Sequence, residues 1–185
     1  HVVREIDALG GEMGLNTDAA TIQFRMLNLS KGAAVQSPRA QCDKVVYQRR
    51  MKWVLERQEN LFVHQAQVLR LLVEEERIVG VVTEFGDRFV AAAVVLATGT
   101  FLNAKLHYGL SDFPGGRAGD VAAVELSRCL REDLALEIGR LKTGTPVRVL
   151  ARTIDFSVLT RQDPDADAPG FAFRKDRSGL PSLGG

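Results

Sequence analysis

The sequence predicts an α/β fold, and three observations support this class. Residues 89–97 form a continuous apolar run of strand length that ends at Gly99. Such a run is typical of a strand covered on both faces, as in a parallel sheet with helices on either side. Apolar residues also recur at helical spacing in three segments, and β-favouring runs lie between them. An ordinary buried strand followed by a turn would give the same pattern at residues 89–97.

The N-terminal third of the chain predicts two helices. Val2, Ile6 and Leu9 fall at helical spacing, and glycines at positions 10–11 offer a stop. Polar, turn-rich passages are expected at residues 16–18 and 28–32. Ser37 and Pro38 then resemble an N-cap and a first helical residue, which predicts a helix that runs to about Gln58.

Residues 61–97 favour strands. Four runs rich in β-branched and apolar residues are separated by three glutamates and by a Gly-Asp pair, which is a hairpin signal. The expected strands are residues 61–64, 67–73, 78–85 and 88–96. They form an antiparallel meander whose last member leads to Gly99.

The remaining chain predicts one helix and a loop-rich tail. A flexible loop at residues 114–116 precedes a helix from about Asp120 to Leu134, with leucines in register at every fourth position. Residues 163–167 are expected to form an acidic turn. Residues 174–185 have a loop composition and are expected to be disordered or to belong with residues beyond this chain.

Bulk properties exclude several classes of protein. The chain of 185 residues can bury one sizeable core, and its net charge of +1 argues against a uniformly basic, nucleic-acid-coating protein. A local basic patch is compatible with that total. The longest apolar run is too short to span a bilayer, and no signal peptide is recognisable. The sequence therefore predicts a cytoplasmic protein without a membrane segment.

The cysteines and histidines offer no catalytic constellation. Cys42 and Cys129 lie far apart, without a partner cysteine or a histidine cluster, so neither a disulfide framework nor a zinc site is indicated. Each falls in a predicted helix among apolar residues, where a free cysteine usually acts as a small buried hydrophobe; a reactive thiol is the alternative. No nucleophile stands beside a base, which points to a borrowed cofactor or to no catalysis within this chain.

Three basic segments are candidates for anion binding. The glycine-rich loop at residues 115–120 precedes a predicted helix, and Arg117 in it offers a bidentate clamp, although Asp120 would also serve as a plain helix cap. The helix carrying Arg49 and Arg50 is basic, which fits phosphate contact or a solvated face. Residues 140–152 hold four cations and no acid.

Seven strings occur in one order along the chain. They are VREIDALGG at 3–11, IQFR at 22–25, LNLSKG at 27–32, PRAQ at 38–41, GTFL at 99–102, GGRAGD at 115–120 and GRLKTGTP at 139–146. Together they resemble the MnmG (GidA) family of tRNA-modifying flavoproteins. Residues 96–99 also resemble the ATG motif of glutathione-reductase-like flavoproteins, which supports FAD at the level of that class.

The resemblance implies a specific architecture. Residues 1–110 are expected to be the second part of a glutathione-reductase-like FAD-binding domain, a βαβ unit with an antiparallel β-meander. Residues 111–185 are expected to begin an inserted α/β domain related to NAD or substrate binding. The chain has no strand followed by Gly-x-Gly-x-x-Gly, so either it binds no dinucleotide or it belongs to a longer chain. In the family, that loop and the catalytic cysteines lie outside the matching region, which predicts an internal fragment without catalytic residues that retains little FAD alone.

The resemblance also implies an activity. Family members are FAD-dependent enzymes that act with a partner GTPase of the MnmE type. They add an aminomethyl or carboxymethylaminomethyl group to carbon 5 of the wobble uridine in tRNA. Methylene-tetrahydrofolate supplies the one-carbon unit and NADH supplies reducing equivalents, in a cytoplasmic homodimer. The alternatives are the related folate- and FAD-dependent tRNA methyltransferase and a non-catalytic module that binds tRNA or a partner protein.

Site residues carry over by position in this sequence. Matched to the family, the expected FAD contacts are Val68 through its backbone, Thr98, Gly99, Thr100, Arg117 and Ala123, where relatives often have serine. The expected tRNA or anion contacts are Arg117, Arg140 and Lys142, and the basic composition of the predicted helix adds Arg49 and Arg50 to them. No metal ligand is predicted.

Overall fold

The computed structural model describes residues 1–166 and 169–174 and divides the chain into two compact units. The first unit contains His1–Val63 and Arg148–Gly185, and the second contains His64–Val147. Both helices and antiparallel sheets are present, so the predicted α/β class is confirmed. The predicted domain boundary at residue 110 lies within the second unit and stays a prediction. No helix in the described residues is both long and apolar enough to cross a bilayer.

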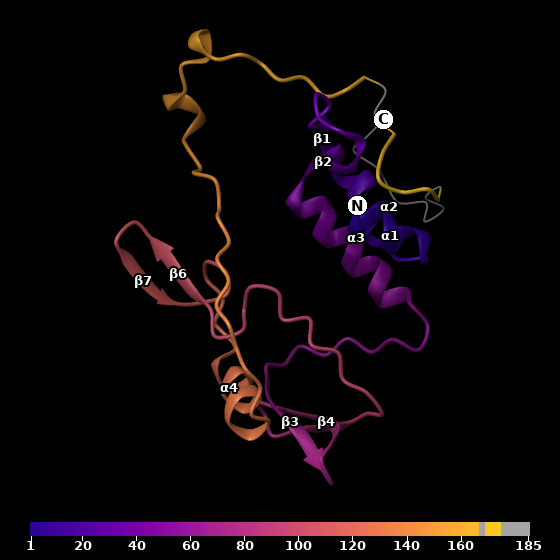
Figure 1. Ribbon diagram of the computed structural model, residues 1–185, viewed down its shortest axis with the longest axis vertical. Helices are drawn as coiled ribbons and strands as arrows, with labels where there is room; N and C mark the ends of the chain where they lie inside the picture. Colours follow the sequence, from indigo (N-terminus) through magenta and orange to yellow (C-terminus); the bar gives the residue numbers. More distant parts are fainter. Residues whose placement is uncertain (167–168, 175–185) are drawn as a thin grey trace. The chain divides into compact units, whose positions relative to one another are not determined.

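The first unit packs helices α1 (Val2–Ala8), α2 (Met13–Ala20) and α3 (Lys44–Arg57) with a ribbon of β1 (Thr21–Leu27) and β2 (Ser37–Cys42) (Figure 1). The predicted first helix is confirmed. The turn expected at residues 28–32 is also present, because Asn28 has a φ of +60° and its carbonyl accepts a hydrogen bond from the Lys31 N–H. A 3-10 turn, Ala33–Val35, leads into β2.

The polar passage expected at residues 16–18 is wrong, since these residues belong to α2. Asn16 is fully buried, and its side-chain amide donates a 3.1 Å hydrogen bond to the Tyr47 carbonyl of α3. Thr17 is buried as well. Polar residues of α2 are thus buried in the unit, where a hydrogen-bond partner such as the Tyr47 carbonyl compensates their lost hydration. A search for regularly spaced apolar residues does not detect a helix buried in this way.

The predicted start of α3 at Ser37 and Pro38 is also wrong. Both residues lie in β2, where Pro38 pairs with Met26 of β1 in an antiparallel register. A two-stranded ribbon consists of edge strands, which tolerate a proline without an N–H donor. The N-cap is Asp43, whose carboxylate accepts hydrogen bonds from the N–H groups of Val45 and Val46 at 2.8 and 2.9 Å. The predicted end near Gln58 is confirmed.

An ion pair between Arg50 and Glu12 links α3 to the N-terminal end of α2. Arg50 is 4% exposed, and its Nη1 donates to a Glu12 carboxylate oxygen at 2.7 Å and to the Asn16 side-chain oxygen at 3.1 Å. A buried guanidinium is stable only where charge and hydrogen bonds compensate its lost hydration. These partners supply that compensation.

The described end of the chain docks on α1 and α2 through two carboxylates. Asp18 accepts hydrogen bonds from the N–H groups of Phe171 and Ala172 at 2.7 and 2.8 Å, and Asp7 accepts one from Phe173 at 2.7 Å. The Phe171 ring meets the Phe24 ring edge-on at 5.6 Å. The 3-10 turns Ala151–Thr153 and Phe156–Val158 precede this segment.

Upstream of this docked end, Asp165 bonds to β1. Its carboxylate accepts a hydrogen bond from the Met26 N–H, and its own N–H donates to the Phe24 carbonyl. Except for Arg174, the tail expected to be disordered, residues 174–185, lies outside the described residues.

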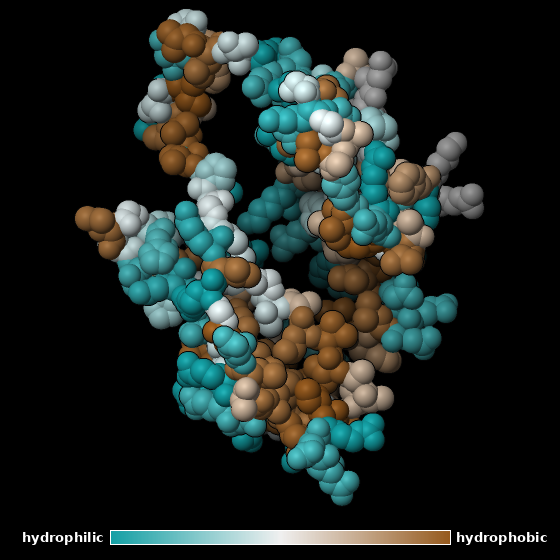
Figure 2. All heavy atoms as spheres, in the orientation of Figure 1, coloured by the Kyte–Doolittle hydropathy of each residue, from teal (hydrophilic) through white to brown (hydrophobic). Residues whose placement is uncertain are grey.

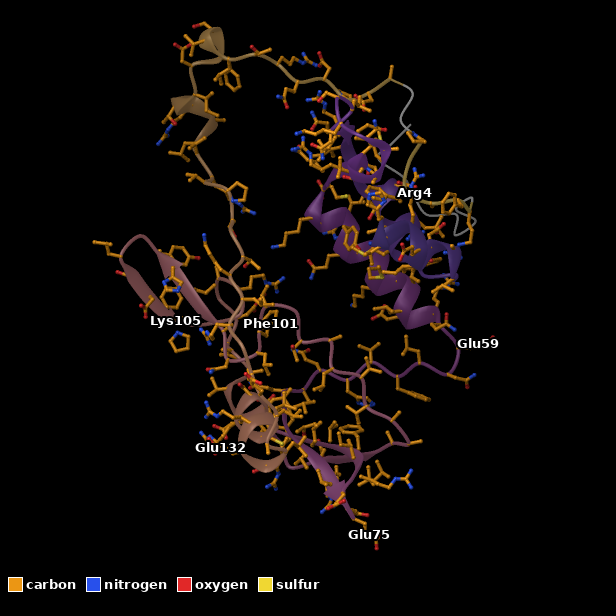
Figure 3. All side chains as sticks on the ribbon, viewed as in Figure 1. Arg4, Glu59, Glu75, Phe101, Lys105 and Glu132 are labelled. Carbon is orange, nitrogen blue, oxygen red and sulfur yellow. The ribbon has the colours of Figure 1, made fainter. Side chains whose placement is uncertain are left out.

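The second unit is built on a three-stranded antiparallel sheet. Strands β3 (Val68–Glu74), β4 (Arg77–Thr83) and β5 (Arg88–Val90) pair in that order, and Glu75 marks the tip of the first hairpin (Figure 3). Glu75 and Glu76 both have positive φ angles, as a two-residue hairpin turn requires. The strands predicted at residues 67–73 and 78–85 are therefore confirmed, the strand predicted at residues 88–96 is confirmed only over residues 88–90, and residues 61–64 form no strand.

One short helix covers the sheet. Helix α4 (Val124–Arg128) continues as a π-helical turn, Cys129–Asp133, and begins four residues later than expected. Its N-cap is Ala123, so the expectation that Asp120 caps it is wrong. Leu126, Leu130 and Cys129 pack against Leu71 of β3 in a buried cluster.

The buried parallel strand expected at residues 89–97 is wrong for this structure. β5 ends at Val90, and the Ala91 N–H still donates a 2.9 Å hydrogen bond to the Val79 carbonyl of β4, whereas residues 92–97 belong to no strand. Val95 is 88% exposed. Apolar atoms accordingly gather on the surface of the second unit (Figure 2). An apolar run becomes a strand only where a neighbouring strand pairs with its backbone, and beyond Ala91 no described strand pairs with this run.

Candidate functional site

The predicted site is built around a turn that follows the apolar run. The Phe101 N–H donates a 3.0 Å hydrogen bond to the Thr98 carbonyl, and Gly99 in between has a φ of +55°. Glycine adopts this left-handed conformation without steric cost. A Cβ added at Gly99 would meet no atom within 4 Å, so this stretch of backbone is open to a ligand.

The glycine-rich loop packs directly on this turn. The Thr100 hydroxyl donates a 2.7 Å hydrogen bond to the Gly116 carbonyl. A Cβ on Gly116 would lie 2.1 Å from a carbon of the Phe101 ring, so only glycine permits this approach. Figure 3 shows Phe101 where the two segments meet. Two motifs that are separate in the sequence are thus brought into one place by direct contact.

The start of α4 completes the arrangement, which we call the Gly99 corner (residues 98–103 and 115–123). The Ala123 N–H donates to the Phe101 carbonyl at 2.8 Å, and the Ala123 carbonyl accepts from the Asn103 N–H at 3.0 Å. Leu102 and Ala123 form an isolated parallel bridge. The Ala123 N–H is already bonded to Phe101, so it is not available to a ligand. The Ala123 carbonyl accepts one hydrogen bond from Asn103 and has a second lone pair that a ligand could use.

Val68 lies close to this corner through the core of the unit. Val68 and Ala123 both pack against the buried cluster of Leu71 and the α4 residues. The neighbouring Gln67 side chain donates a 3.2 Å hydrogen bond to the Ala122 carbonyl. The structure therefore connects Val68, at the start of β3, with Ala123 through the core cluster, and Ala123 with Phe101 through a hydrogen bond.

Arg117 and Arg140 lie at the corner with different partners. Arg117 Nε contacts an Asp120 carboxylate oxygen at 2.6 Å in an exposed ion pair. Such pairs contribute about 0–1 kcal/mol, so an incoming anion can compete for the guanidinium. Arg140 Nη1 donates to the Asn103 carbonyl at 2.9 Å, whereas Lys142 is exposed two residues further along.

Arg49 and Arg50 belong to the first unit and differ from each other. Arg49 is exposed on α3, as an anion contact requires. Arg50 is buried and bonded to Glu12 and Asn16, so in this structure it joins two helices and offers no surface to a nucleic acid.

Phe101 and Asn103 are site residues that the sequence reasoning did not single out. Phe101 supplies the ring against Gly116 and both backbone groups that hold the turn, and Asn103 links Ala123 with Arg140. The feature of the sequence that could have indicated Phe101 is the glycine pair at 115–116. Two adjacent residues without side chains indicate that a bulky group packs closely against that backbone.

Neither cysteine is placed for chemistry. Burial raises the pKa of the Cys129 thiol, which lies in the core cluster, and also raises the pKa of the half-buried Cys42 thiol in β2. The prediction of a buried hydrophobe is confirmed for Cys129; the predicted helical environment of Cys42 is wrong, because it is a strand residue.

These raised pKa values predict slow thiol labelling. The thiolate is the reactive form, and a higher pKa leaves less of it at any pH below that value. We expect both cysteines of the native chain to react with a disulfide reagent at pH 8 more slowly than free glutathione does. Absorbance at several pH values measures this, and unfolding in urea should restore ordinary rates. Rapid labelling of the native chain at pH 8 would contradict the burial described here.

Comparisons with known proteins point to one family. A family model described as glucose inhibited division protein A matches residues 1–181. GidA of Aquifex aeolicus, solved in two crystal forms, is 47% identical with a TM-score of 0.85 in each. The match covers 98% of this chain and 30% of that chain. A GidA-related protein from Thermus thermophilus is 33% identical over 49% of this chain and 40% of its own, with a TM-score of 0.46. This chain thus spans about a third of the length of the solved GidA protein.

Proposed function

Because this chain belongs to the GidA family, we propose that it serves in an FAD-dependent enzyme that modifies tRNA. The proposed reaction adds an aminomethyl or carboxymethylaminomethyl group to carbon 5 of the wobble uridine. It takes place together with an MnmE-type GTPase and in a homodimer. The observation that supports this proposal best is the Gly99 corner, where two of the family strings meet around an open backbone turn.

The residues present fit a flavin nucleotide. No atom lies within 4 Å of a Cβ built on Gly99, so the ring system of a flavin could approach the backbone there. Thr98, Gly99 and Thr100 would line it, and the Val68 backbone and Ala123 carbonyl would contact it from the adjoining strand and helix. Arg117 would pair with a phosphate in place of Asp120. When bound, FAD supplies the redox chemistry, while methylene-tetrahydrofolate and NADH supply the carbon unit and reducing equivalents.

The protein's own contribution is to bind and orient. The hydrogen bonds from Thr100 to Gly116 and from Ala123 to Phe101 hold the turn in one conformation before any ligand arrives. Such preorganisation lowers the entropic cost of binding. Arg140 and Lys142 in the second unit, and Arg49 on α3 in the first, would meet tRNA phosphates, whereas Arg50 keeps its structural role.

A domain exchange tests this proposal. The 185 residues would replace their counterparts in Aquifex aeolicus GidA, and the chimera would be compared with its parent for flavin absorbance and for modified wobble uridine by mass spectrometry. We expect one FAD per chain and the parent's product. A colourless chimera would contradict the cofactor assignment. A yellow chimera that forms 5-methyluridine instead would favour the folate-dependent methyltransferase, and one without product would favour a binding module.

A further inference from the structure

Helix α3 carries a stripe of cation, aromatic ring and cation. Arg49, Trp53 and Arg57 follow one another at intervals of four residues, which places them along one side of the helix. Arg49 and Arg57 are exposed and Trp53 is half-buried. The Arg57 guanidinium carbon lies 4.7 Å from the centre of the Trp53 ring, within the range of a cation–π contact.

The charges of this stripe are not neutralised by neighbouring acids. Glu56 is the only acidic residue between Lys44 and Arg57, and its carboxylate pairs with Lys52 at 3.3 Å. In the part of the chain that the structure describes, Arg49 and Arg57 have no carboxylate within 4.0 Å. Two arginines therefore remain for an external anion beside an indole ring.

We propose that Arg49, Trp53 and Arg57 form a stacking platform for an unpaired nucleotide of tRNA. Guanidinium planes stack on aromatic rings on one side and on nucleobases on the other. The Arg57 guanidinium lies over the Trp53 ring, so the side of it that faces away from the ring can receive a base, while Arg49 can bind a phosphate. The two arginines are eight residues apart, about 12 Å along the helix axis. That separation suits consecutive nucleotides of a single-stranded loop.

The chemistry of this stripe favours RNA over other anionic partners. An acidic peptide would pair with the two arginines but would gain nothing from the contact between the guanidinium and the indole. An unpaired nucleotide pairs with the arginines through its phosphate and stacks on the guanidinium through its base. Base stacking on such side chains contributes about 1–3 kcal/mol per base. This inference rests on the proposed function, which supplies a tRNA whose modified base lies in an unpaired loop.

The chain offers a direct probe, because Trp53 is its only tryptophan. Titrating the 185-residue chain with tRNA should quench the Trp53 fluorescence, and polyglutamate of equal charge should not. Arg57→Gln and Trp53→Leu should each lower the affinity for tRNA about 5-fold or more, which corresponds to the lower part of the stacking range. Arg49→Gln should also reduce the slope of affinity against salt concentration by about one.

Matched controls separate this inference from its premise. Lys52→Gln changes a cation on the same helix that is already paired with Glu56, so its effect should stay below about 2-fold. Because Trp53 is half-buried, circular dichroism verifies that Trp53→Leu folds, and exposed Arg57→Gln provides the same test without disturbing the core. Unchanged affinity of Arg57→Gln, equal quenching by polyglutamate or absence of tRNA binding would each overturn the platform. The chimera's flavin and product would still decide the proposed function independently.

Discussion

Replacing Gly116 by alanine should disrupt the Gly99 corner. The added methyl group would lie 2.1 Å from a Phe101 ring carbon, and two further ring atoms lie within 2.7 Å. The ring or the glycine-rich loop must therefore move, and the hydrogen bond from Thr100 to the Gly116 carbonyl would be strained. Overpacking of this kind costs about 1–3 kcal/mol. Urea unfolding of the chain should show that loss of free energy, and the chimera carrying Gly116→Ala should lose most of its flavin.

Gly144→Ala is the matched control. A Cβ at Gly144 would meet no atom within 4 Å, and its φ is not in the left-handed region. We expect unchanged stability and flavin content for this variant. Equal behaviour of the two alanine variants would show that the contact between Gly116 and Phe101 does not hold the corner together.

Arg50→Met should destabilise the first unit. Methionine retains much of the apolar stem but leaves the Glu12 carboxylate and the buried Asn16 oxygen without their guanidinium partner. Removing one member of a buried ion pair often costs about 3–5 kcal/mol, and because Glu12 is partly exposed we expect about 2–3 kcal/mol. The midpoint of urea unfolding measures this change.

The neighbouring residue supplies the comparison. Arg49→Met alters the same helix at an exposed position and should change stability by no more than about 0.5 kcal/mol. If both variants unfolded at the wild-type urea concentration, the ion pair would contribute nothing to the packing of α2 and α3.

Local signals predicted the elements whose shape is set by neighbouring residues. The Glu75–Glu76 turn, the strands on both sides of it and the end of α3 follow from short-range propensity and periodicity. The leucine register of α4 is likewise visible in sequence, and it places Leu126 and Leu130 in the core as expected.

The local signals gave wrong predictions where contacts with residues far away in the sequence determine the structure. In the sequence Pro38 has the pattern of a helix start, but in the structure it pairs with Met26 of β1. Asn16 has the pattern of a turn residue, but it lies in a helix because the Tyr47 carbonyl accepts its side-chain hydrogen bond. The run at residues 92–97 shows the converse, because it is apolar but no described strand pairs with it. At the site, the strings identified which segments matter, whereas the packing of Phe101 on Gly116 emerged only in three dimensions.

The carboxylates of Asp7 and Asp18 bind main-chain amides rather than side chains of residues 171–173. Side chains add to this attachment, since Phe171 packs on Phe24, Phe173 lies under the Arg4 guanidinium and Arg174 contacts Asp7 at 3.5 Å. None of these contacts requires an unbroken covalent connection. A chain cut once between the 3-10 turns would consequently keep its far portion as a bound peptide, much as a split protein reassembles from two pieces.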